Sequence, residues 1–280
     1  YKINSRMLLS GAVRHTNSPE NNFRNVWNVQ SSFRYQIHPQ YSFLVSLGKY
    51  SNFSYAVLPS VGFTFNTSEQ ASLDIKGRFS RIPFELSFYH NRIRSVKAVI
   101  SAEDIFTDNG IPEQTIIGAD LSTTIPIAKN AEWKSAVAFF SNKGKDTQYR
   151  KFKSSRDISP ILRSNLTYYF SKAKISTTLS ASYRNGKRYT PFYGVADTSG
   201  VISLQPGNRN SEQLPEYFRL DFNAYKIVSV FGRNTVLYTT ISNITDNKNV
   251  SKIGYTKDFN QEKRYFSGRM FFIGMTVNLL

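Results

Sequence analysis

Apolar and polar side chains alternate at a period of two residues in about twelve separate segments of this chain. In the segment 174–184, Ile175, Leu179 and Tyr183 fall on one side of the pattern, while mostly serine, threonine and arginine fall on the other. Successive side chains of an extended strand point to opposite faces, so this period predicts β-strands with one apolar and one polar face. Helical periodicity is not sustained in any segment, and we therefore predict an all-β fold.

The predicted strands are separated by connections of two lengths. We predict strands at 5–14, 24–37, 41–50, 69–79, 83–96, 114–127, 132–141, 159–170, 174–185, 216–229, 234–244 and 266–279. Short connections at 38–40, 80–82, 129–131, 171–173 and 231–233 alternate with long ones at 15–23, 51–68, 97–113, 142–158, 186–215 and 245–265. This alternation is typical of transmembrane antiparallel β-barrels of the bacterial outer membrane, with short periplasmic turns and long extracellular loops.

The composition agrees with a barrel rather than a helical membrane protein. No run approaches the roughly 18 consecutive apolar residues of a membrane-spanning helix. Aromatic residues make up 15% of the chain and gather near predicted strand ends, as in the interfacial girdles of such barrels. Cross-strand packing is an alternative explanation for them. These aromatic residues are Trp27, Tyr35, Tyr41, Phe79, Phe84, Trp133, Phe139, Tyr168, Phe170, Tyr217, Phe218 and Phe271.

The polar faces of the predicted strands carry charge. The residues that we expect to point into the barrel are Arg14, Arg34, Asp74, Lys76, Arg78, Asp120, Lys134, Arg163, Arg184, Arg219 and Asp221. Two interpretations stay open. The charges can pair across strands or hold a plug, or a positive interior can attract an anionic solute such as a metal chelate.

Nothing in the sequence indicates catalysis. There is no cysteine, and His15, His38 and His90 match no zinc-binding spacing, so we expect no metal site, no cofactor and no enzyme activity. The net charge of +17 raises the question of nucleic acid, but no nucleic-acid-binding motif accompanies it. We therefore expect the positive charge to meet the phosphate-rich lipopolysaccharide leaflet or an anionic solute.

The long loops hold the candidate binding residues. Exposed aromatic and basic side chains on loops are candidates for capturing a ligand. We select Tyr50, Phe53, Tyr55, Arg184, Arg188, Tyr189, Phe192 and Tyr193 on this ground. The connection 142–158 is rich in cations that can contact lipid A phosphates. The candidates for this contact are Lys143, Lys145, Arg150, Lys151 and Lys153.

Several short motifs resemble a known family. The runs 214–221 (LPEYFRLD), 240–247 (TISNITDN) and 268–275 (GRMFFIGM) resemble the closing strands of TonB-dependent outer-membrane receptors. The run 71–79 followed by 83–89 is similar to a mid-barrel hairpin of the same family. The abundance of asparagine and lysine is similar to that of Bacteroidetes members.

The resemblance implies a role and a set of partners. Barrels of this family have about 22 strands, so residues 1–280 are expected to be the C-terminal part of one barrel domain, with the plug domain outside this chain. The complete receptor would import a scarce nutrient, driven by TonB through the plug, with a surface lipoprotein as a possible further partner. A self-closed 12-strand outer-membrane channel and a soluble β-sheet binding protein are the alternatives.

Overall fold

A computed structural model describes residues 3–16, 26–55, 63–97, 113–146, 150–196, 198, 200, 202–230, 232–256 and 260–277. These residues form an all-β structure dominated by one antiparallel sheet of thirteen strands. Its main path runs β1-β2-β3-β4-β5-β6-β7-β9-β10-β15-β16-β19, and β8 pairs with β7. Each long strand therefore pairs with the long strand that follows it in the sequence. No helix in these ranges is long and apolar enough to span a membrane.

The strands of the main path are long, and all twelve overlap predicted strands. They are β1 (Met7–Thr16), β2 (Val26–His38), β3 (Tyr41–Tyr55), β4 (Phe63–Phe79), β5 (Ile82–Lys97), β6 (Glu113–Ala128), β7 (Ala131–Lys145), β9 (Ile161–Phe170), β10 (Ile175–Arg184), β15 (Tyr217–Val230), β16 (Arg233–Ser242) and β19 (Met270–Val277). The bounds differ most at β3 and β4, which extend into the predicted connection 51–68, and β19 begins at residue 270 and not at 266. The predicted end of the last strand, at residues 278 and 279, lies outside the described residues.

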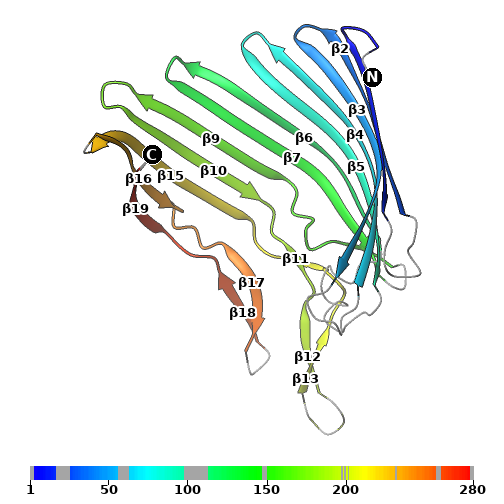
Figure 1. The fold of residues 1–280 in the computed structure, drawn as a ribbon. Coiled ribbons are helices and arrows are strands. Elements are labelled where there is room, and N and C mark those ends of the chain that lie inside the picture. The colour runs from blue at the N-terminus through cyan, green and yellow to red at the C-terminus, as the bar shows by residue number, and fades with distance from the viewer. Residues whose placement is uncertain are drawn as a thin grey trace.

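The long connections contain strands that the sequence pattern did not predict. These are β8 (Lys151–Lys153), β11 (Arg188–Tyr189), β12 (Phe192–Ala196), β13 (Ile202–Pro206), β14 (Glu212–Gln213), β17 (Val250–Tyr255) and β18 (Gln261–Tyr265). Three separate two-stranded sheets result, β11 with β14, β12 with β13 and β17 with β18. They extend beyond one end of the main sheet (Figure 1). We call this end the long-loop rim and the opposite end the short-turn rim.

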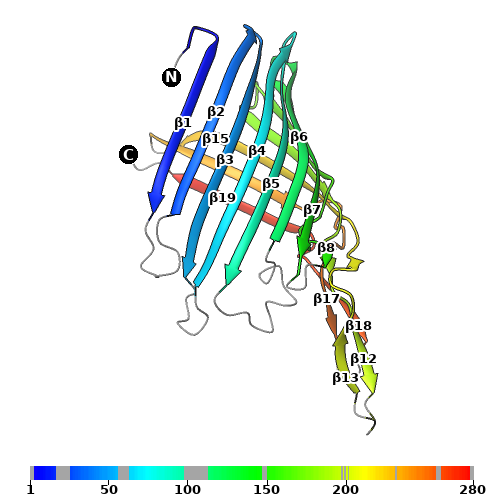
Figure 2. The same cartoon turned by 90° about the vertical axis from the view of Figure 1, so that its right-hand side faces the viewer.

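The main sheet is strongly curved and open. Figure 2 shows β15 and β19 passing behind β1 to β4, so the sheet forms a trough. Within the described residues, β1 pairs only with β2 and β19 pairs only with β16, so both edge strands lack a partner on one side. The two ends of the sheet are therefore available for pairing with other strands.

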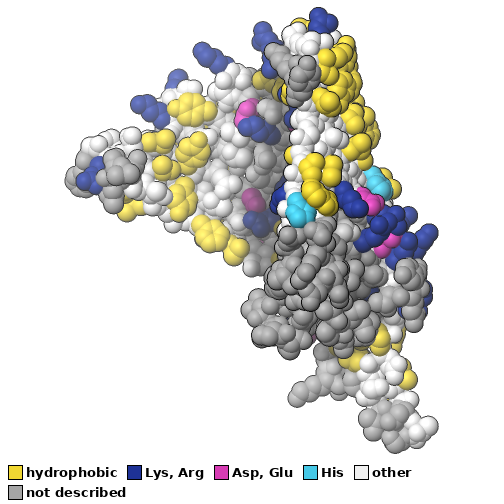
Figure 3. Space-filling view, turned by 45° about the vertical axis from the view of Figure 1, so that its right-hand side comes forward, with side chains coloured by type: hydrophobic (Ala, Val, Ile, Leu, Met, Phe, Trp, Pro, Cys, Tyr) yellow, Lys and Arg dark blue, Asp and Glu magenta, His cyan; other side chains and the backbone are white. Residues whose placement is uncertain are grey.

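The register sorts side chains onto two faces. Directly paired residues lie on the same face, as in the row Val45, Leu73, Phe88, Ala119 and Phe139 across β3 to β7. We call the face that carries this row the apolar face and the opposite one the polar face. Figure 3 shows hydrophobic side chains along the outside of the curved sheet. Eleven of the twelve predicted girdle aromatics lie on the apolar face; Tyr217 is the exception, on the polar face.

The buried side chains are mostly polar and many large apolar side chains are exposed, which is the reverse of the pattern in a soluble domain. Among the described residues, the buried hydrophobic ones are Leu214 and Val250, whereas most buried side chains are polar. On the apolar face, Ile273 is 89% exposed and Met275 is 68% exposed. Contiguous apolar surface of this extent on a soluble monomer is rare, because water disfavours it. The sheet therefore has an outer face rich in exposed apolar side chains, and some apolar side chains, such as Leu8, Ile227 and Phe272, lie on the polar face.

Candidate functional site: the polar face and the long-loop rim

The charged residues predicted to point inward share the polar face. One row across the sheet pairs Lys76 with Glu85, Glu85 with Ser122, Ser122 with Ala136, and Ala136 with Arg163. It continues through Ser182 to Arg219. The other predicted inward residues have the same parity on their strands, so the register confirms that all eleven lie on one face.

The acids of this face have partners on neighbouring positions. Asp74 accepts a hydrogen bond from Ser87 at 2.6 Å, and Asp120 accepts one from Tyr89 at 3.2 Å. Asp221 accepts one from the Arg219 guanidinium at 2.6 Å. Pairing within the wall therefore accounts for the three acids that the sequence placed inside.

The cations of this face exceed its acids. Lys76 pairs with Glu85 at 2.9 Å, and Lys134 pairs with Glu132 at 2.7 Å. In contrast, five arginines have no carboxylate within 4 Å among the described residues. These arginines are Arg14, Arg34, Arg78, Arg163 and Arg184. Because they are spread over β1, β2, β4, β9 and β10, the surplus positive charge extends over much of the face.

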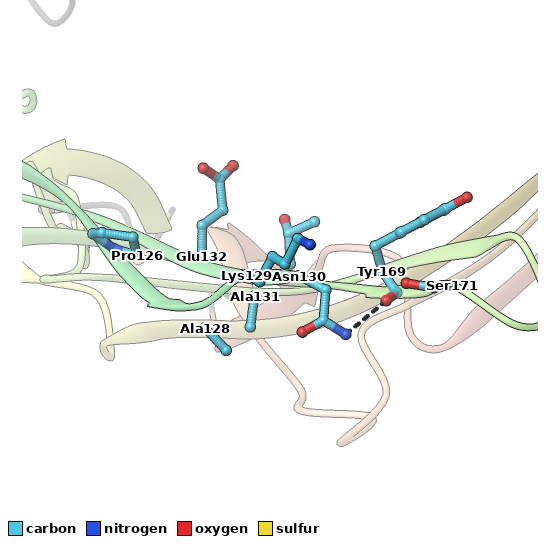
Figure 4. A pocket seen from close by; sticks show the side chains of 9 residues that line it. Pro126, Ala128, Lys129, Asn130, Ala131, Glu132, Tyr169 and Ser171 are labelled. Carbon is cyan, nitrogen blue, oxygen red and sulfur yellow. Dashed lines mark hydrogen bonds between the residues drawn. The ribbon is translucent and has the colours of Figure 1, made fainter.

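Two of the hollows on the sheet are lined by charged side chains and turn residues that bear on a binding site. The first, of about 540 Å³, is lined on the polar face by Lys76, Glu85, Lys134 and Arg163, among others. The second, of about 680 Å³, lies at the short-turn rim between the turns that follow β6 and β9. There the Asn130 amide donates to the Tyr169 carbonyl oxygen at 3.0 Å (Figure 4). The first hollow combines cations with a floor of small side chains, which suits a carboxylate or another small anion.

The candidate ligand residues of the loop 186–215 are drawn together by short hairpins. Arg188 and Tyr189 pair with Gln213 and Glu212 across β11 and β14. The Tyr189 hydroxyl donates to the Glu212 carboxylate. Burial, together with this hydrogen bond, raises the pKa of Tyr189 well above its usual value. Tyr189 is thus a neutral donor already used inside the protein.

Phe192 connects two hairpins. Its backbone N–H donates to the Tyr255 hydroxyl at 2.7 Å, and the two rings meet edge to face at 5.8 Å. The β12–β13 hairpin is thereby attached to the β17–β18 hairpin. Tyr193, next along β12, is 53% exposed and is the most exposed aromatic candidate among those whose side chains the structure describes.

The remaining ligand candidates lie elsewhere. Arg184 stacks on the Tyr217 ring, with its guanidinium carbon 4.7 Å from the ring centre. The Tyr50 hydroxyl donates to Gln30 at 3.2 Å on the polar face of β3. Phe53 and Tyr55 belong to β3 by their backbone, but their side chains lie outside the described part of the structure. The structure therefore groups Arg188, Tyr189 and Phe192 and places Tyr50 on a different strand.

The connection 142–158 is more ordered than we expected. Strand β7 extends to Lys145, and β8 pairs with it, so that Lys143 lies opposite Lys153 and Lys145 opposite Lys151. Arg150 pairs with Asp146 at 2.8 Å. The predicted loop is thus partly a β-hairpin, because pairing with β6 and β8 continues past the predicted end of the strand.

Asn249, two residues beyond the run 240–247, and Asp246 within it hold the strand ends near the C-terminus together. Asn249, which is 3% exposed, accepts a hydrogen bond from the Phe218 backbone N–H at 2.9 Å and donates to its carbonyl oxygen at 2.7 Å. Asp246 accepts from the Arg269 backbone N–H at 2.8 Å. These contacts tie β15 to the segments that flank β17 and β19. Their role is structural, and spacing in the sequence did not reveal it.

Comparison with solved structures identifies the fold. The ferric yersiniabactin uptake receptor FyuA from Yersinia pestis matches with a TM-score of 0.69 and 11% identity, over 98% of this chain and 43% of that chain. FpvA from P. aeruginosa, solved with pyoverdines, matches at 0.66 and 13% identity, over 98% and 36%. The copper transporter OprC matches at 0.66 and 14% identity, over 97% and 45%.

The comparisons support the fold and not a narrower identity. No protein-family model matches the sequence, and no curated protein matches it. The chain spans less than half the length of these three receptors. The thirteen-strand antiparallel sheet is therefore the fold of part of an outer-membrane receptor barrel. Among the described residues, no group of three histidine or acidic side chains is placed to hold a metal ion.

Proposed function

We propose that this chain is the C-terminal barrel wall of a TonB-dependent receptor that takes up a scarce nutrient across a bacterial outer membrane. On this proposal the long-loop rim is extracellular, the short-turn rim is periplasmic, and the chain is not an enzyme. The similarity in composition to Bacteroidetes members makes that group the proposed source.

One observation carries the proposal: the curved sheet exposes its apolar face, and within the described ranges both edge strands lack a partner on one side. In hydrocarbon, each unpaired backbone N–H or C=O group costs several kcal/mol, so open sheet edges are not tolerated there. Strands β1 and β19 therefore require partner strands. The structural neighbours are more than twice as long as this chain. Their length supports the proposal that the partner strands come from the N-terminal part of the same receptor.

The proposed partners follow from this assignment. A plug domain would occupy the polar side of the sheet and would contact TonB, so that this chain contributes the wall, the loops and part of the binding surface. A surface lipoprotein that covers the long-loop rim is a further proposed partner. No contact with nucleic acid is proposed.

The proposed nutrient is anionic. The uncompensated Arg14, Arg34, Arg78, Arg163 and Arg184 give the polar face a surplus of positive charge, which attracts anions into a narrow aqueous space. A metal chelate that bears carboxylate or catecholate groups fits this charge. Tyr50, Phe53, Tyr55, Arg184, Arg188, Tyr189, Phe192 and Tyr193 remain the proposed ligand-contacting residues.

Purification from native outer membranes, followed by uptake and conductance measurements, tests the proposal. We expect the 280-residue sequence to be found joined to or bound to a plug and about ten further strands. We also expect uptake by cells to stop when the TonB system is inactivated. Steady conductance in planar bilayers by this chain alone would instead establish a self-closed channel, and extraction without detergent would establish a soluble protein.

A further inference from the structure

The apolar face ends abruptly on one part of the sheet. Across β3 to β7, the row Leu47, Ala71, His90, Ile117 and Ser141 is uncharged or aromatic. The next row toward the long-loop rim contains Lys49, Glu69, Arg92, Thr115 and Lys143. Charged side chains thus replace apolar ones within one step of the alternation.

A second charged row follows directly. It pairs Arg94 with Glu113, Glu113 with Lys145, and Lys145 with Lys151 on β8. We define the basic sector as the cations of the two rows, namely Lys49, Arg92, Arg94, Lys143, Lys145 and Lys151. Lys153, which is opposite Lys143 on β8, is left out because its carboxylate partner Asp157, at 3.9 Å, lies outside the two rows.

The basic sector lies on the outside of the sheet. Arg92 and Lys143 are each four residues from a member of the row that contains Phe88 and Phe139, so the period of two places them on the same face. Figure 3 shows Lys, Arg, Asp and Glu side chains gathered below the hydrophobic band on this side of the molecule. These cations therefore do not face the polar interior.

Two acidic side chains form ion pairs with cations of the basic sector but do not cancel its positive charge. Glu113 lies 2.7 Å from Arg92, 2.7 Å from Lys145 and 3.8 Å from Arg94. Glu69 lies 3.5 Å from Arg94. Two carboxylates face six cations in these rows, so a positive surplus remains.

Three of the six cations are open to a ligand. Lys49, Lys143 and Lys151 are exposed, and none has a carboxylate within 4 Å in the part of the chain that the structure describes. The two arginines carry planar donor groups that match phosphate oxygens in pairs. The sector thus combines fixed guanidinium groups with freely moving ammonium groups.

The charge is confined to one part of the sheet. On β9, β10, β15, β16 and β19, the apolar-face residues at the same rim are Leu162, Tyr183, Phe218, Ile241 and Phe271. Charge at the rim is therefore not a general property of the strand ends. It extends from β3 to β8, a width of about 24 Å at the usual strand spacing.

We propose that the basic sector binds the phosphates of an outer-leaflet lipid whose headgroup carries more than one phosphate. This inference rests on the proposed outer-membrane location. Acyl chains then lie along the apolar rows below, and the headgroup phosphates meet the two charged rows at the hydrocarbon boundary. A width of about 24 Å exceeds that of a single phosphate and suits several phosphates. Cations near a membrane surface bind anionic headgroups in this way.

Binding of lipid A to the detergent-purified, delipidated full receptor tests the proposal. The test variant is Lys49→Gln/Lys143→Gln/Lys151→Gln, which keeps the contacts of Glu113. The control variant is Lys129→Gln/Lys172→Gln/Lys226→Gln, which removes the same charge near the short-turn rim. Native mass spectrometry compares bisphosphorylated lipid A, dephosphorylated lipid A and inorganic phosphate.

We expect the test variant to bind bisphosphorylated lipid A roughly a hundredfold more weakly, because each surface cation contributes about fivefold. The control variant keeps the affinity of the unmodified protein. Dephosphorylated lipid A and inorganic phosphate bind weakly to all three proteins. Equal binding by the test and control variants, or equal binding of dephosphorylated lipid A, overturns the proposal. The lipid-binding assay does not depend on transport. A failure of TonB-dependent uptake would therefore contradict the proposed function without deciding whether the basic sector binds lipid.

Discussion

Asn249 shows how a polar residue stabilises this structure. Its side chain is buried and satisfies both the N–H and the C=O of Phe218, where β15 begins. Its neighbour Asn243 is 2% exposed and adopts a φ of 53°, which asparagine tolerates better than most residues. A sheet with its apolar face outside relies on such polar contacts at the strand ends, because it has no apolar core there.

Replacement of Asn249 tests this role. We expect Asn249→Ala to lower the free energy of unfolding by about 1 to 3 kcal/mol, because it leaves the Phe218 backbone N–H unpaired. The Phe218 carbonyl oxygen keeps its hydrogen bond from the Asn247 side chain at 3.2 Å. The exposed Asn234, whose side chain makes no hydrogen bond to the described residues, provides the control. Asn234→Ala is expected to change the unfolding free energy by less than about 0.5 kcal/mol. Urea unfolding in lipid vesicles measures both, and equal effects would refute the role.

The predicted ligand-contacting residues stay a prediction, and the structure shows only how those residues are arranged. The loop 186–215 was selected for its aromatic and basic residues, and the structure groups Arg188, Tyr189 and Phe192. Tyr255, which binds the Phe192 backbone, lies 63 positions away and was not selected. A contact between separate loops leaves no periodic signal, so the sequence pattern alone could not indicate it.

At the scale of elements, the alternation of apolar and polar side chains made the long strands of the main sheet predictable. Each long strand has one face in a uniform environment, so its side chains follow the period of two along its length. The short strands within the long loops do not show this period of two. The strand β12 has the sequence FYGVA, which is nearly continuous in apolar residues, and β11 and β14 contain two residues each. Such short elements are formed by tertiary pairing and not by a local pattern.

Adjacent positions on β19 test the assignment of faces. Ile273 lies on the apolar face and Phe272 on the polar face, and both are exposed hydrophobic residues. We expect Ile273→Lys to destabilise the inserted protein by about 2 to 4 kcal/mol, because it places a charge in hydrocarbon. Phe272→Lys places its charge in water and is expected to cost less than about 1 kcal/mol. The measurement is the unfolding free energy in lipid vesicles; a larger cost for Phe272→Lys would reverse the faces.

At the scale of the whole molecule, two surfaces hold much of the positive charge behind the net charge of +17. Part of it lies on the polar face as arginines without acidic partners, and part lies outside in the basic sector. The sequence indicated both destinations, an anionic solute and the lipid leaflet. It could not indicate that the outer cations span β3 to β8, because that depends on the register between strands far apart in the chain.

The open edges are the other property of the whole molecule. Strands β1 and β19 end the sheet, and the structural neighbours extend well beyond the matched region. The even number of predicted strands left a self-closed barrel as an alternative, and only the pairing in three dimensions shows an open trough. The outer-membrane assignment therefore depends on the apolar face contacting lipid and the polar face contacting water.

A single-cysteine accessibility scan of residues 270–277 in the full receptor, in lipid vesicles, tests this most directly. The chain contains no cysteine, so each introduced thiol in it can carry one spin label. The account predicts that labels at 271, 273, 275 and 277 are relaxed by lipid-soluble oxygen and that labels at 270, 272, 274 and 276 are relaxed by a water-soluble nickel chelate. Protection of the odd-numbered positions from both reagents, as at a protein–protein contact, would contradict it.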